Sequence, residues 1–171
     1  MNRRSILSVS VITVMGLVLM PNDAVTQQKS LRDQLVGAWT FVSATDVKPD
    51  GSTTNRWGSN PKGILVFDSN GHYSLTIMRS DLPKFAAKTA DQGTADENKA
   101  VLQGMITHFG TYSVNEADKT LTTRVEGSSF PNLVGVEQKR TIASLTADEL
   151  KYANPATATG TRAEAVWKRV K

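Results

Sequence analysis

Between residues 36 and 170 the chain consists of short segments rich in β-branched and aromatic residues, joined by turn-forming residues. The clearest junction is Asn70-Gly71, because Asn-Gly between two apolar runs is the strongest short hairpin signal. The pattern predicts strands at residues 36–47, 63–67, 73–79, 106–114, 120–128, 136–145, 150–154 and 162–170. Short turns favour antiparallel neighbours, so we expect an all-β fold, an antiparallel up-and-down β-barrel of about eight strands. Its interior would hold either packed side chains or one small ligand.

Two segments depart from the strand pattern. Ser30 is a plausible N-cap for one short helical turn before the first strand. The insertion at residues 80–105 contains a capping box, Thr94 with Glu97, which predicts a short helix at about 95–103. This helix would either cover an open barrel mouth as a lid or pack outside the barrel or in one end. As a lid it would turn these apolar residues toward the cavity: Phe85, Val101, Leu102 and Met105.

Residues 1–24 have the features of a secretory signal peptide. Arg3 and Arg4 precede an apolar run at residues 6–20, which is shorter than the ~20 residues of a membrane-spanning helix and ends at Pro21. We expect cleavage after Ala24, with an uncleaved anchor as the alternative. Cleavage leaves a lead at residues 25–34 and a barrel domain at 35–171, in the periplasm or outside the cell and without a stable membrane span.

The composition excludes several classes of site. The 171 residues include no cysteine and only two histidines, so disulfides, thiolate nucleophiles and cysteine-rich metal sites are excluded. The 20 basic and 16 acidic side chains are scattered rather than gathered in a stripe, and we expect no nucleic-acid partner. We also expect no metal and no cofactor. Nothing in the sequence indicates an oligomeric state.

Strand alternation predicts which side chains face the lumen. On residues 72–77 it turns Tyr73, Leu75 and Ile77 inward, and Trp39 and Phe41 likewise share one face. Inward aromatic residues either contact a ligand or fill the core. The candidates of this kind are Tyr73, Tyr112, Tyr152 and Trp167.

A polar group is predicted on two neighbouring strands. If residues 120–128 and 136–145 pair through the loop near Asn132, positions whose numbers add to about 264–266 lie opposite each other. Glu126 then faces Gln138 or Arg140. Inside the lumen, a buried Glu–Arg pair with Gln138 would orient a ligand carboxylate or carbonyl. The alternative is that this face lies outside and is solvated.

The two histidines have two interpretations each. His72 and His108 could act as a general base or as part of a metal site. Alternatively, His72 is a solvated neighbour of a turn and His108 a hydrogen-bonded residue near the barrel rim. The second interpretation is favoured because no set of three or four ligating groups stands out.

Five segments, taken in order, resemble the bacterial lipocalin-like domain family over about residues 31–171. They are Leu35-Val36-Gly37-Ala38-Trp39; Trp57-Gly58 with Asn60-Pro61-Lys62-Gly63; Phe67-Asp68 with Gly71-His72-Tyr73; Phe109-Gly110-Thr111-Tyr112; and Glu126-Gly127-Ser128 with Pro131-Asn132 and Gly135. The resemblance implies a small barrel with a central cavity and a tryptophan packed across its closed end, without an agreed catalytic set. Residues 121–125 lack the histidines that many relatives carry there, and the chain lacks the disulfide of secreted animal lipocalins.

Three functions are compatible with these features. The first is a binding protein that holds a small, largely apolar or amphipathic molecule. The second is an isomerase or cyclase in which Glu126, Tyr112 or His108 moves a proton, and the third is a structural or interaction barrel with a packed lumen. The candidate ligand-binding residues are Tyr73, Phe85, His108, Tyr112, Glu126, Gln138, Arg140 and Tyr152.

Overall fold

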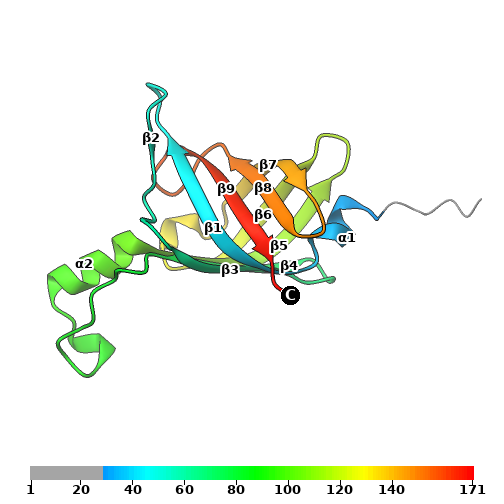
Figure 1. The fold of residues 1–171 in the computed structure, drawn as a ribbon. Helices are drawn as coiled ribbons and strands as arrows, with labels where there is room; N and C mark the ends of the chain where they lie inside the picture. The colour runs from blue at the N-terminus through cyan, green and yellow to red at the C-terminus, as the bar shows by residue number, and fades with distance from the viewer. Residues whose placement is uncertain (1–28) are drawn as a thin grey trace, which may run out of the picture.

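A closed antiparallel barrel forms the body of the protein in the computed structural model, which describes residues 29–171 (Figure 1). Each long strand pairs with the next long strand, and β1 pairs with β9 to close the barrel. The two-residue β2 (Thr53–Thr54) pairs antiparallel with the last two residues of β1. The eight long strands are β1 (Gly37–Val47), β3 (Lys62–Phe67), β4 (His72–Met78), β5 (Met105–Asn115), β6 (Thr120–Ser128), β7 (Glu137–Leu145), β8 (Glu149–Asn154) and β9 (Arg162–Arg169). The predicted fold class is confirmed, whereas the predicted signal peptide lies outside the described residues.

The two ends of the barrel differ in their connections. Strand direction places the short turns at residues 68–71, 116–119 and 146–148 at one end. The longer connections at residues 48–61, 79–104, 129–136 and 155–161 all lie at the other end. Within residues 29–171, no helix has the length and apolarity needed to cross a membrane.

The end with the short turns is sealed by Trp39 and Arg169. The Trp39 side chain is fully buried, and its indole Nε1 donates to the Leu35 carbonyl of α1 (Leu31–Leu35) at 2.8 Å. The Arg169 guanidinium carbon lies 4.0 Å from the centre of the Trp39 ring. The predicted Ser30 cap is present, with its hydroxyl accepting from the Asp33 N–H. This is the closed end, as the family resemblance implies.

The predicted alternation is confirmed on β4 and on the first half of β1. Tyr73, Leu75 and Ile77 are buried, and so are Trp39 and Phe41. The Trp167 ring, fully buried on β9, packs 4.9 Å from Phe41, measured between ring centres. Trp167 is therefore part of the packed core.

The register predicted for β6 and β7 is wrong. Leu121 pairs with Arg140 and Thr123 with Gln138, three to five positions away from the expected pairing. The shift arises because the connection contains a 3₁₀ turn, Pro131–Leu133, and because Val125 bonds back to Gly135 and Val136. As a result Gln138 and Arg140 face inward, while Arg124 and Glu126 are exposed.

The insertion between β4 and β5 projects away from the barrel wall (Figure 1). Its helix α2 (Ala95–Gly104) carries the predicted capping box, with the Glu97 carboxylate accepting from the Thr94 N–H at 2.8 Å. Leu102 is 60% exposed, and Phe85 packs against Gly93 within the insertion itself. The lid prediction is therefore wrong for Phe85 and Val101, because the helix continues outward from β5 instead of folding over the lumen.

Candidate functional site

A cavity of about 80 Å³ lies in the half of the lumen that faces the long connections. Its wall is largely apolar and comes from strands on every side of the barrel. The apolar wall residues are Ala44, Trp57, Leu75, Ile77, Ile106, Leu133, Tyr152, Ala158, Ala163 and Ala165. A cavity needs at least about 10–15 Å³ to hold one water molecule, so this space is large enough to be occupied.

Toward the closed end the lumen is filled by side chains. Leu65, Phe67 and Leu121 are at most 2% exposed and leave no room for a water molecule there. The sequence left open whether the lumen is packed or open, and the structure shows both states in different halves. The closed half is core, and only the half near the long connections can hold a ligand.

Arg140 lies where these two halves meet, and it is only 4% exposed. Its Nη1 donates to the Thr123 hydroxyl at 2.5 Å, and its Nη2 donates to the Gln138 side-chain oxygen at 2.6 Å. The guanidinium carbon is 5.6 Å from the centre of the Tyr152 ring. The cation is therefore held by neutral oxygen atoms and one aromatic face.

Tyr73 and His108 form a second polar contact in the interior. The Tyr73 hydroxyl lies 2.8 Å from His108 Nδ1, and both side chains are about 4% exposed. Burial, together with the positive charge of Arg140, lowers the pKa of His108 from 6.5 to about 3. Burial raises the pKa of Tyr73, against the opposing effect of Arg140. His108 is accordingly neutral near pH 7 and Tyr73 keeps its proton.

The rim of the cavity carries one acidic and one basic side chain. Asp46 is 5% exposed, and burial raises the pKa of its carboxyl group while the charge of Arg56 opposes the rise. Arg56 is half-buried, with its guanidinium carbon 4.6 Å from the centre of the Trp57 ring. Arg56 acts on Asp46 through its charge and not through an ion pair within 4.0 Å.

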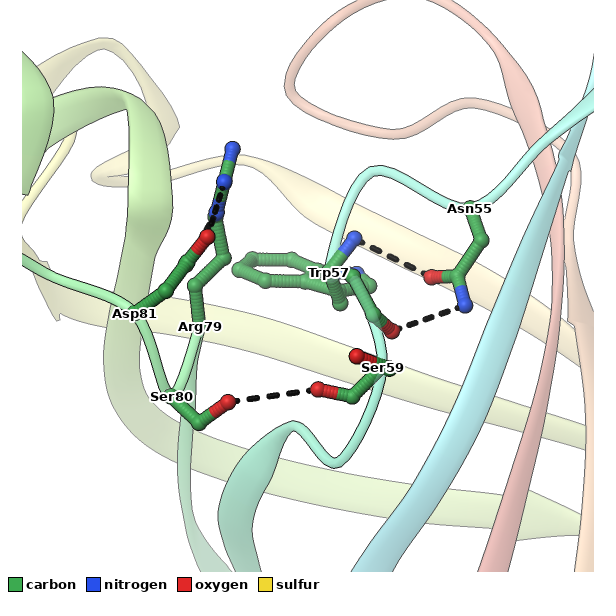
Figure 2. Close-up of polar contacts among 7 residues, drawn as sticks. Asn55, Trp57, Ser59, Arg79, Ser80 and Asp81 are labelled. Carbon is green, nitrogen blue, oxygen red and sulfur yellow. Dashed lines mark hydrogen bonds and ion pairs between the residues drawn. The ribbon is translucent and has the colours of Figure 1, made fainter.

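Trp57, which lines the cavity, belongs to a short loop held by polar contacts (Figure 2). The Trp57 N–H donates to the Asn55 side-chain oxygen at 3.1 Å, and the Asn55 amide donates back to the Gly58 carbonyl at 2.9 Å. The Ser80 hydroxyl donates to the Ser59 carbonyl at 3.2 Å and ties this loop to the chain after β4 (Figure 2). The Trp57 ring is 5% exposed, so this loop narrows the mouth of the barrel.

Outside the entrance lies an open groove of about 520 Å³. It shares Asp46, Arg56, Ile106 and Ala158 with the cavity, so the two spaces adjoin at the rim. Leu102 and Met105 line its outer side. These are the two residues of the expected lid that do lie near the entrance.

Five of the sequence-predicted site residues come together inside the barrel. They line the cavity or the layer directly beneath it: Tyr73, His108, Gln138, Arg140 and Tyr152. His72, by contrast, is a solvated turn residue whose ring lies 3.2 Å from Asp68.

Three predicted site residues lie elsewhere. Glu126 is on the outer surface, so the buried Glu–Arg pair does not form. Tyr112 points inward at the closed end, where its hydroxyl donates to the Asp68 carbonyl at 2.8 Å. Phe85 belongs to the outward insertion. Of the three proton carriers considered for an enzyme, only His108 lines the cavity.

Sequence reasoning missed Asp46, Trp57 and Thr123. Simple alternation from Phe41 turns Asp46 outward, but a bulge between Phe41 and Ser43 switches the inward face of β1. Thr123 lies on the same face of its strand as Leu121 and Val125, and this alternation could have placed it inside the barrel. Trp57 lies in a loop, where no periodicity applies.

An antiparallel barrel with one end sealed by an inward tryptophan and a small lumen open toward the other end is a lipocalin-like barrel. The model of the lipocalin-like domain family matches residues 36–170, and the chain belongs to this family. None of the curated proteins compared with the sequence matches it.

Several solved barrels are similar to the chain at low identity. A redesigned β-barrel shares 17% identity, with 84% of this chain and 100% of that chain covered and a TM-score of 0.41. Bovine odorant binding protein in complex with a selenium-containing odorant shares 15% identity, with 84% and 74% covered and a TM-score of 0.43. The same bovine protein complexed with its natural ligand shares 16% identity, with 84% and 76% covered and a TM-score of 0.42.

Proposed function

We propose that this protein is an exported binding protein that holds a small, largely apolar molecule in the lumen of its barrel. The observation that carries the proposal is the apolar cavity lined by Trp57, which adjoins the outer groove at its rim. Export is supported by the charged, apolar and cleavage-site pattern of residues 1–24.

The size of the cavity limits how a ligand would lie. At about 80 Å³ it is smaller than the ~300–1,000 Å³ of ordinary ligand pockets, so it takes only one end of a molecule. The remainder extends past Trp57 into the groove, against Leu102 and Met105. A slender chain suits this path better than a broad ring system.

The first test uses the whole chain, expressed with its own leader and purified from the exported fraction. Native and denaturing mass spectra are compared for a small molecule that leaves on unfolding. Isothermal titration calorimetry with 1-octanol then tests the apolar site directly. A mature N-terminus at Val25 supports export by cleavage, and a full-length mass contradicts it.

Two leucine variants on β9 locate the binding. Ala163 is buried and lines the cavity, so Ala163→Leu should fill it and weaken 1-octanol binding at least tenfold. Its neighbour Glu164 is exposed, so Glu164→Leu adds an apolar side chain outside and should leave binding unchanged. No bound mass together with no 1-octanol binding refutes the proposed function, as does equal weakening by the two variants.

A further inference from the structure

We infer that the ligand of this lumen carries a carboxylate head group, which Arg140 binds at the floor of the cavity. The inference rests on the proposed function and specifies the chemical class of its ligand. It begins from the burial of Arg140, which lines both the cavity and the packed layer below it.

Within residues 29–171, Arg140 has no charged partner. Both side-chain oxygens that it contacts belong to neutral groups, on Thr123 and Gln138. Among the residues that the structure describes, no carboxylate oxygen lies within 4.0 Å of its guanidinium nitrogens. A buried ion without a counter-ion costs several kcal/mol of folding free energy. If position 140 served only the stability of the barrel, an apolar residue would be favoured there.

The other titratable groups around the lumen do not supply the missing negative charge. Asp46 lies at the rim and makes no ion pair with Arg140, and burial raises the pKa of its carboxyl group while the charge of Arg56 opposes the rise. Burial keeps His108 neutral near pH 7. Tyr73 and Tyr152 keep their protons, since burial raises the pKa of both. Glu126 is on the outer surface. None of these groups therefore places a negative charge in contact with Arg140.

The geometry suits a small planar anion. A guanidinium has five N–H donors, and Arg140 uses two of them on Thr123 and Gln138. The remaining donors can serve a carboxylate, whose planar shape matches the guanidinium fork. The cavity has room for such a head group and the first carbons of a chain, and its apolar wall favours an aliphatic continuation.

The test compares three ligands that share one chain: octanoate, 1-octanol and octylamine. By calorimetry at pH 7.5, we expect the wild-type protein to bind octanoate at least tenfold more tightly than 1-octanol, and octylamine most weakly. Arg140→Met should bind octanoate no more tightly than 1-octanol while it retains 1-octanol binding. Arg124→Met removes the same charge from an exposed position on the neighbouring strand and should keep the wild-type order.

The outcomes separate the two proposals. Binding of 1-octanol as tight as that of octanoate in the wild type overturns the carboxylate inference and leaves the apolar site standing. Absence of binding by all three compounds overturns the proposed function itself. If Arg140→Met does not fold, Arg140→Lys keeps the charge but loses the guanidinium fork, and it should reduce the preference for octanoate without reversing it. A preference of Arg140→Lys for 1-octanol contradicts the inference. Octylamine binding equal to that of octanoate in the wild type contradicts the inference without any variant.

Discussion

Replacing Arg169 tests how the closed end is held together. Its Nε donates to the Ala147 carbonyl at 2.6 Å, Nη1 to Val36 at 3.0 Å and Nη2 to Gln34 at 2.5 Å. Hydrogen bonds from a charged donor contribute about 1.5–3 kcal/mol each, and the cation over Trp39 adds about 1 kcal/mol. Because Arg169 is only half-buried, hydrogen bonds to water will replace part of this stabilisation when the side chain is removed. We expect Arg169→Met to cost about 3 kcal/mol.

The assay is urea unfolding followed by far-UV circular dichroism, with thermal unfolding as a second measurement. A loss of about 3 kcal/mol corresponds to a fall in Tm of roughly 6–12 °C for a domain of this size. Arg162 lies on the same strand, is exposed and pairs only with Glu164, so Arg162→Met should cost about 0–1 kcal/mol. A loss below 1 kcal/mol for Arg169→Met, or equal losses for the two variants, would refute this account of the closed end.

Three further predictions concern other parts of the chain. The folded-state pKa of His108 lies below its unfolded value, so the unfolded state binds the extra proton as pH falls from 6.5 toward 3, and stability should decrease by up to about 1.4 kcal/mol per pH unit. His108→Gln should show a shallower decrease over that range in urea titrations at matched pH values, and an unchanged slope would contradict the low pKa. A Cβ on Gly110 would lie 2.0 Å from the Arg124 carbonyl oxygen, so Gly110→Ala should destabilise the barrel by about 3 kcal/mol or prevent soluble expression, and a variant of wild-type Tm would show that the β5–β6 bulge adapts. Thr94→Ala removes the hydroxyl that caps α2 and should loosen that helix by about 1 kcal/mol in amide hydrogen exchange without changing global unfolding, because α2 projects from the barrel. A matching fall in global stability would mean that α2 supports the barrel.

Local signals in the sequence predicted the local structure well. The capping box at Thr94 and Glu97, the Ser30 cap and the Asn70-Gly71 turn all form. Each depends on groups a few residues apart in the chain, so the interaction is encoded in a short window. The burial of Trp39 followed in the same way from strand alternation.

Predictions that needed long-range register failed. Glu126 was expected opposite Gln138 or Arg140, on a face either inside the lumen or outside. The 3₁₀ turn at Pro131–Leu133 shifts the pairing, so Gln138 and Arg140 face inward while Glu126 lies outside. Asp46 was missed because the bulge after Phe41 switches the inward face of β1. A one-residue change of register moves a side chain to the opposite face, so each such shift decides whether a residue belongs to the lumen.

The sequence by itself determined the strands, the turns between most of them, the capped helices and therefore an antiparallel barrel, because propensity and alternation act within one segment. Only the tertiary structure decided that Arg140 lies in the lumen without a carboxylate, that the closed half is packed and that the insertion points outward. Those properties depend on the register of each strand relative to its neighbours, which bulges and loop lengths determine. That arrangement minimises the energy of the whole closed sheet, and no single segment contains it.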